Sequence, residues 1–219
     1  MRVFCKILLT VLCLTFATPA LAEFKTDNPQ AVHDTLRKAE DAMRAKEFSK
    51  AKTIITDLAK QEEPISMYIM GFLAASGSGQ KQDFKEAEKW WLKASEAGLP
   101  NAQFNLGMLY YSGAMGSTDM KKARDQWVKA AGVGHPDAQF GLGLLQMTGQ
   151  GGAKETANAI KNFQAAADRG HPQALMAMGK AYATGEGVKK DTKKAKEWFE
   201  KAKKAGVPVP DDVMKDLGK

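Results

Sequence analysis

The apolar positions of the segment Pro100–Ser112 recur with the period of an α-helix. They lie at i, i+4 and i+7, on Ala102, Leu106 and Leu109. Gly113 then ends the pattern, as glycine commonly does at the C-terminus of a helix. The segment is therefore predicted to form one helix that buries a single apolar stripe.

A second helical pattern follows between residues 119 and 131. Its apolar face carries Ala123, Trp127 and Ala130, and glycine and proline residues between positions 132 and 136 end it. Two such helices joined by a short loop form a hairpin. Gly107 on the first helix lets the second helix approach closely, and the large Trp127 side chain fills the space that remains.

The same hairpin pattern recurs along the chain at intervals of 36 residues. The recurring positions are the glycines Gly71, Gly107, Gly143 and Gly179, the prolines Pro64, Pro100, Pro136 and Pro172, and the alanines Ala87, Ala123, Ala159, Ala195, Ala94, Ala130, Ala166 and Ala202. A register kept at so many positions identifies tandem repeats, in which each hairpin buries its apolar face against its neighbours.

The repeated units resemble the Sel-one-like repeats, relatives of the tetratricopeptide repeat. The resemblance covers residues 64–206 and is closest in the last copy, which carries Ala174, Met178, Gly179, Tyr182, Gly185, Gly187, Asp191, Ala195, Trp198, Ala202 and Gly206 in order. It implies an all-α fold, a right-handed α/α solenoid of helical hairpins. A few positions depart from the pattern: Met115 replaces a loop glycine and Gln146 a tyrosine, both at positions expected to be exposed, and Ser66 replaces an alanine.

The register sets the expected domain organisation. The four repeats are predicted at residues 64–99, 100–135, 136–171 and 172–207. Residues 23–63 hold two more helical stretches, 28–46 and 49–60, and are predicted to form an N-terminal helical cap. Residues 208–219 are predicted to contain a C-terminal capping helix, because Asp211 can cap a short helix that covers the last repeat.

Residues 1–22 have the pattern of a cleaved secretory signal peptide. Arg2 and Lys6 flank an apolar run from residue 7 to residue 16, and Ala20-Leu21-Ala22 resembles a cleavage site. The run is too short for the roughly 20 residues that span a bilayer, so we expect no transmembrane segment. Both cysteines lie within the leader. The exported chain is therefore expected to be periplasmic or secreted and free of disulfides.

Loss of the leader lowers the formal net charge from +7 to +5, and the excess is local. Eight lysines lie between Lys189 and Lys204, against the acidic residues Asp191, Glu197 and Glu200. Such a helix face is usually just solvated, but it could also contact an anionic surface such as phospholipid or lipopolysaccharide. We expect no nucleic-acid partner.

The tetratricopeptide-like geometry that the resemblance implies places three positions of each first helix on a concave groove. These lie three before, one after and four after each repeat glycine. The predicted groove residues are Tyr68, Phe72, Phe104, Met108, Tyr111, Phe140, Leu144, Met147, Met176 and Lys180. An exposed apolar stripe indicates a binding surface, so we expect a partner protein that supplies a peptide or an amphipathic helix. The alternative for Phe104 and Phe140 is packing between adjacent helices.

The sequence offers little catalytic chemistry, so we expect a monomeric scaffold and not an enzyme, with no cofactor and no metal. His135 and His171 occupy the same Gly-His-Pro turn in neighbouring repeats, about 10 Å apart by helix-packing dimensions, too far to share a metal unaided. Ser49 and Ser78 each precede a lysine by three residues, as in penicillin-recognising enzymes, but the partner motifs of those enzymes are missing. A β-lactam-binding or cell-wall enzyme is the alternative function.

Overall fold

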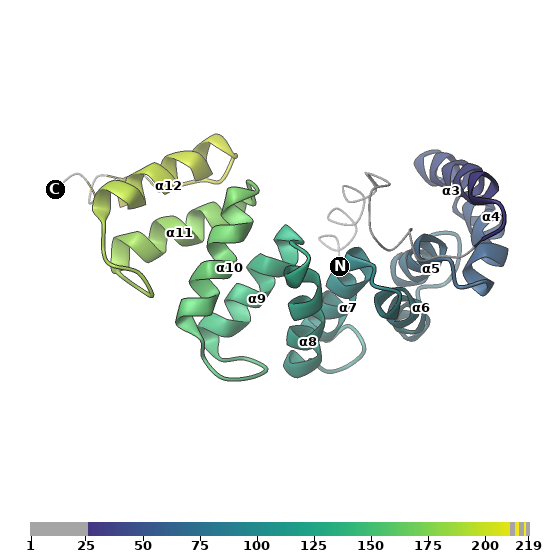
Figure 1. The fold of residues 1–219 in the computed structure, drawn as a ribbon, viewed down its shortest axis with the longest axis horizontal. Coiled ribbons are helices and arrows are strands. Elements are labelled where there is room, and N and C mark those ends of the chain that lie inside the picture. Colours follow the sequence, from purple (N-terminus) through teal and green to yellow (C-terminus); the bar gives the residue numbers. More distant parts are fainter. Residues whose placement is uncertain (1–25, 211–212, 215–216, 218–219) are drawn as a thin grey trace. The chain divides into compact units, whose positions relative to one another are not determined.

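The computed structural model describes residues 26–210, 213–214 and 217, and within these ranges the chain forms ten helices and no strand (Figure 1). They are α3 (Pro29–Arg44), α4 (Phe48–Lys60), α5 (Pro64–Ser76), α6 (Phe84–Glu96), α7 (Pro100–Ser112), α8 (Met120–Gly132), α9 (Pro136–Thr148), α10 (Thr156–Asp168), α11 (Pro172–Thr184) and α12 (Thr192–Lys204). The prediction of an all-α fold of successive helical hairpins is confirmed.

The chain divides into two compact units, Met1–Leu109 (unit 1) and Tyr110–Lys219 (unit 2), so the boundary falls within α7. In unit 1, α3 packs on α4, α4 on α5 and α5 on α6. In unit 2, each helix from α8 to α12 packs on the next one along the chain. Packing between consecutive elements is what a repeat protein requires, since each hairpin covers the one beside it.

Proline and a side-chain cap start most of the first helices of the hairpins. Proline is the first helical residue of α5, α9 and α11, where its missing N–H costs nothing. The preceding residue accepts from the free backbone N–H groups of the first turn: Glu63 before α5, His135 before α9 and His171 before α11. The repeated Pro register of the sequence therefore marks helix starts.

The small residues of the repeat are buried as predicted. All eight register alanines on the second helices, from Ala87 to Ala202, are fully buried. A Cβ added at Gly71 would lie 2.5 Å from the Trp91 ring, and one at Gly143 or Gly179 would lie 2.6 Å from a phenylalanine ring of the following helix. The repeat glycine and the aromatic residue opposite it therefore set the distance between the two helices of a hairpin.

Gln146 corrects the sequence-based expectation of an exposed rim position. Its side chain is buried, and it donates from Nε2 to Glu155 at 3.1 Å and accepts from Asn162 Nδ2 at 2.7 Å. Arg124 forms a salt bridge to the other oxygen of Glu155. The hydrogen bond from Asn158, with further contributions from Arg124 and Gln146, holds the pKa of Glu155 below its usual range. A partly buried polar network thus takes the place of a tyrosine.

Two predicted segments lie wholly or mostly outside the described residues. These are the leader, 1–22, and the C-terminal capping helix, of which only Val213, Met214 and Leu217 are described. No helix in the described ranges has the length and apolar character needed to cross a membrane.

Candidate partner-binding face

The predicted groove positions of unit 2 form an accessible face on α9 and α11. Phe140, Leu144 and Met147 lie on one side of α9, and Met176 and Lys180 on the corresponding side of α11; these five residues are called the α9–α11 face below. Leu144 is 40 % exposed and Lys180 is exposed, while the other three side chains are half-buried. Apolar side chains therefore predominate at positions that water can reach.

The half-buried members of this face rest on the core of unit 2. Phe140, Met147 and Met176 pack against a buried cluster that includes Phe163, Leu175 and Met178. The Phe140 ring lies 5.7 Å from the Phe163 ring and stacks on His171 at 4.6 Å between centroids. Phe140 therefore has a packing role and is only partly accessible, whereas Leu144 is the most exposed apolar residue of the face.

The equivalent positions of unit 1 differ from the prediction. Tyr68, Phe72 and Phe104 are buried, at 2 %, 5 % and 8 % exposure, and Met108 is half-buried. The expected exposure of Phe72 is therefore wrong, because α5 has no charged residue and almost all of its side chains are buried. Tyr111, in unit 2, is 38 % exposed and packs against the Trp127 ring.

Tyr68 is fixed in place by polar contacts. Its hydroxyl accepts a hydrogen bond from Asn105 Nδ2 at 3.3 Å, and its backbone carbonyl accepts from the Trp91 indole at 3.1 Å. Burial raises the pKa of Tyr68 to about 12. A side chain held in this way is part of the core of unit 1 and not a free contact for a partner.

The two histidines of the Gly-His-Pro turns meet at one carboxylate, which the sequence did not predict. The Nδ1 atoms of His135 and His171 accept from the N–H groups of Ala138 and Ala174, at 3.4 and 3.2 Å. Nε2 of His171 lies 3.3 Å from one oxygen of Asp137, and Nδ1 of His135 lies 3.8 Å from the other.

This arrangement shifts the protonation of its members. The hydrogen bond from His171 is the main cause that lowers the pKa of Asp137, against the opposing effect of burial. Burial is also the main cause that lowers the pKa of His135. Neutral histidines with an unprotonated Nδ1 can act as helix caps. The signal that could have revealed the cluster is the carboxylate that follows Pro136 directly, beside two equivalent histidines.

The Ser-x-x-Lys segments lie at the junction of the first two hairpins. Ser49 donates to the carbonyl of Gly79 at 3.4 Å, and Lys52 contacts the side chain of Gln80. Ser78 accepts from the Ser76 hydroxyl at 2.9 Å. Within the ranges that the structure describes, neither serine is hydrogen-bonded to the lysine three residues later. Both hydroxyls are instead bonded to groups of the α5–α6 loop and the end of α5.

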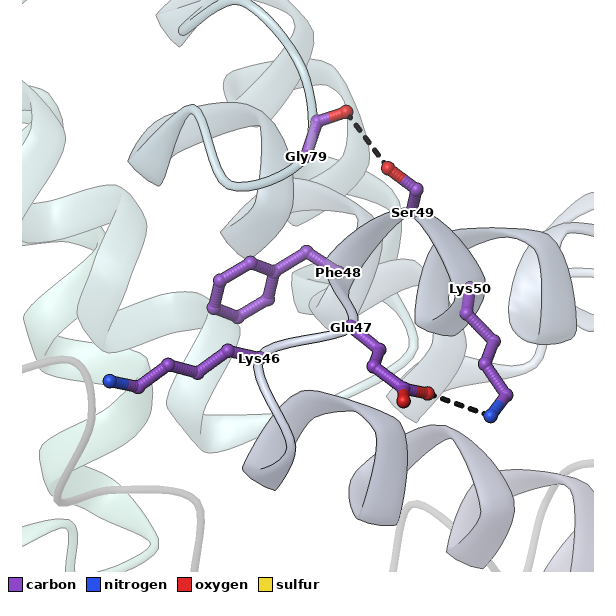
Figure 2. Close-up of a pocket in the computed structure, with 6 residues that line it drawn as sticks. All are labelled: Lys46, Glu47, Phe48, Ser49, Lys50 and Gly79. Carbon is purple, nitrogen blue, oxygen red and sulfur yellow. Dashed lines mark hydrogen bonds and ion pairs between the residues drawn. The ribbon is translucent and has the colours of Figure 1, made fainter.

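A shallow pocket of about 470 Å³ opens beside Ser49 and is lined by Lys46, Glu47, Phe48, Ser49, Lys50 and Gly79 (Figure 2). Glu47 and Lys50 pair with each other at 2.7 Å, on the side away from the Phe48 ring. Gly79 adopts a left-handed conformation, and a Cβ there would lie 2.9 Å from the Ser49 nitrogen. The pocket thus lies where the loop after α5 meets the start of α4.

Comparison with known families decides what kind of repeat this is. The model of the Sel1 repeat matches four consecutive segments, residues 64–99, 100–132, 136–171 and 172–207, which together make up more than half of the chain. The chain belongs to the Sel1 repeat family. The predicted family resemblance is therefore confirmed, and the matched segments coincide with the hairpins from α5/α6 to α11/α12.

Solved Sel1 repeat structures resemble this chain over most of its length. A Sel1 repeat protein from Oxalobacter formigenes is 29 % identical, with a TM-score of 0.72 and 82 % of each chain covered. The protein c5321, described as a protective antigen of uropathogenic Escherichia coli with an SLR fold, is 31 % identical, with a TM-score of 0.68. The match covers 71 % of this chain but only 33 % of c5321. A search of curated proteins gives no match.

The described side chains include no group of three or more histidine, cysteine, aspartate or glutamate residues placed to hold a metal ion. The cluster of His135, Asp137 and His171 uses both Nδ1 atoms as acceptors for backbone N–H groups. Its geometry is that of two helix caps joined by a carboxylate.

Proposed function

We propose that this chain is an exported protein-interaction scaffold that holds a peptide or an amphipathic helix of a partner protein against the α9–α11 face. The observation that carries the proposal is the accessibility of Leu144, at 40 % exposure, among three half-buried apolar side chains. A contiguous apolar surface in contact with water is costly, and proteins keep such surfaces mainly where a partner covers them.

The chemistry of the face favours an apolar helix or an extended peptide as the partner. Met147 and Met176 are flexible and polarizable, so they adapt to an irregular apolar surface. Phe140 offers a ring edge held in position by Phe163 and His171. Lys180, at the end of the stripe, can pair with an acidic residue of the partner and fix its orientation.

The scaffold role agrees with the family, whose members are generally protein-interaction scaffolds. Export rests on the leader pattern of residues 1–22, and the proposed location is the periplasm or the extracellular space. The proposed working form is a monomer, because a second copy on the same face would compete with the partner.

Site-specific photo-crosslinking in the native host tests the proposal. A photo-reactive amino acid at position 144 should give a discrete adduct with one partner protein. The matched control is the same probe at Val133, which follows α8 and is 65 % exposed, so it samples another apolar surface position. Adducts of equal yield and pattern at both positions, or none at position 144, would contradict the proposal.

A further inference from the structure

The outer side of α12 carries an unusual concentration of positive charge. Six lysines of the helix and two of the preceding loop are all exposed: Lys189, Lys190, Lys193, Lys194, Lys196, Lys201, Lys203 and Lys204. They are called the α12 basic face below. The opposite side of the helix buries Ala195, Phe199 and Ala202 in the core of unit 2. The lysines therefore predominate on the side that faces solvent, which they share with the exposed Glu197 and the half-buried Glu200.

Among the described residues, several lysines of the earlier helices pair with carboxylates, and the lysines of the α12 basic face do not. Lys50, Lys93 and Lys121 each lie within 2.9 Å of a carboxylate oxygen. By contrast, none of the eight lysines of the α12 basic face lies within 4.0 Å of a carboxylate in the described part of the chain. Eight lysines against Asp191, Glu197 and Glu200 leave this segment a net charge of +5, which an external anion can balance.

Two aromatic rings lie within the same face. Lys201 Nζ lies 4.1 Å from the centre of the Trp198 ring, and Lys194 Nζ lies 5.3 Å from that of Tyr182. Both rings are half-buried and pack on the core cluster of unit 2. Tryptophan and tyrosine beside lysine are typical of side chains at a bilayer–water interface, where the apolar ring and the polar group meet different media.

We propose that the α12 basic face docks on a membrane surface containing anionic phospholipid. A bilayer presents its phosphates as a plane, so lysines spread along a whole helix can contact it together. Each lysine near an anionic bilayer strengthens binding by about fivefold, so several act together as a weak but useful anchor. The α9–α11 face is made of other residues, and the docking does not depend on partner binding there.

Vesicle co-sedimentation tests this docking with the chain that lacks residues 1–22. Binding to vesicles of equal parts phosphatidylglycerol and phosphatidylcholine should exceed binding to phosphatidylcholine alone at least about tenfold. It should disappear as salt is raised, because the Debye length falls from about 10 Å at 0.1 M to about 3 Å at 1 M.

A matched pair of variants separates this face from overall charge. Lys193→Gln, Lys196→Gln, Lys203→Gln and Lys204→Gln together should lower vesicle binding at least about tenfold. The control carries Lys50→Gln, Lys60→Gln, Lys81→Gln and Lys85→Gln, which remove the same charge from exposed positions of unit 1, and it should bind like the unaltered chain.

Three results would overturn the proposal. These are equal binding to the two kinds of vesicle, an equal loss in the control variant, and tighter binding to double-stranded DNA than to the anionic vesicles at the same salt concentration. A separate variant tests the aromatic contribution. Trp198→Ser should weaken vesicle binding relative to the unaltered chain with little change in salt dependence, since it removes an apolar contact and not a charge.

Discussion

The first and last repeats have the same contact inside the hairpin but present different outer surfaces. Gly71 faces Trp91 in the first repeat, and Gly179 faces Phe199 in the last, with nearly the same close contact. The position after each repeat glycine differs: Phe72 is 5 % exposed, whereas Lys180 is exposed. The inner positions therefore specify the hairpin, and the outer positions are free to specify what each repeat contacts.

The largest expected effect concerns that outer position. Phe72→Ala should lower the free energy of unfolding by about 3 to 5 kcal/mol, because it empties a buried aromatic site. Leu144→Ala, at the equivalent position of the third repeat, should change it by less than about 0.5 kcal/mol. Denaturant unfolding of both variants measures the difference. A small loss for Phe72→Ala would show that the first repeat is open too and would extend the binding face to it.

A smaller effect is expected at the shared core. Gly71→Ala and Gly179→Ala should each cost about 1 to 3 kcal/mol, because the new methyl group overlaps the opposing ring. Gly71→Ala should cost more, since the Trp91 indole donates to Tyr68 and cannot move without losing that bond.

Gly132→Ala is the control for these variants. This glycine is the last residue of α8, and an added Cβ meets nothing within 4 Å. The substitution should leave stability unchanged or raise it by up to about 1 kcal/mol. A destabilised control would show that chain-wide effects, and not the opposing rings, explain the losses.

The histidine cap at the start of α9, His135, should make stability depend on pH. The pKa of His135 is lowered in the folded chain, so the unfolded chain binds a proton first. The cap's contribution to the free energy of unfolding is complete above the ordinary histidine pKa of about 6.5. It falls by about 1 kcal/mol, the usual contribution of a helix N-cap, as the pH drops below that value. The lowered pKa of Asp137 adds a further loss at more acidic pH, below 3.8.

Unfolding of His135→Asn across pH measures this contribution, because asparagine caps a helix without titrating. The variant should lose much of the decline between neutral pH and the range in which Asp137 titrates. His33→Gln, at a half-exposed histidine of unit 1, serves as the control and should keep the full decline. Identical pH profiles for His135→Asn and the unaltered chain would exclude the capping explanation.

The smallest effect is a gain. Ser66 is fully buried, and its hydroxyl has no hydrogen-bond partner in the described part of the chain. Alanine occupies the equivalent position as Ala102, Ala138 and Ala174, all fully buried. Ser66→Ala should therefore raise the free energy of unfolding by up to about 1 kcal/mol, and Ala102→Ser should lower it by a similar amount. A thermal unfolding assay measures both changes. A loss of stability in Ser66→Ala would contradict the prediction, because it would mean that the serine hydroxyl is hydrogen-bonded in the folded chain.

The sequence predicted those parts of the fold in which the two helices of a hairpin approach closely, because such positions recur as small residues. Gly143 and Ala159 are invariant in the register because the helices meet there, and no larger side chain fits. The sequence did not predict the burial of side chains whose neighbours lie on other elements. Gln146 was expected at the rim but is buried beside Glu155 and Asn162, and the period of one helix does not reveal these partners.

The candidate site was predicted in part for the same reason. The spacing from each repeat glycine identified Leu144 and Met147 as accessible positions on α9. It gave the same prediction for Phe72, because a helical register cannot tell whether a neighbouring segment covers the position. The His135–Asp137–His171 cluster was missed because it depends on contacts between two turns in adjacent repeats.

One measurement tests the central claim, that outer positions of the third and fourth repeats bind the partner while the shared core only supports them. A photo-reactive amino acid at Lys180 reports partner contact in the native host, and Leu144→Asp with Met147→Asp is introduced into the same chain. The account predicts that the adduct is lost. It also predicts that the core around Gly179 and Phe199 stays folded, so the variant should unfold cooperatively like the unaltered chain. An adduct that persists at full yield in a folded variant would contradict it.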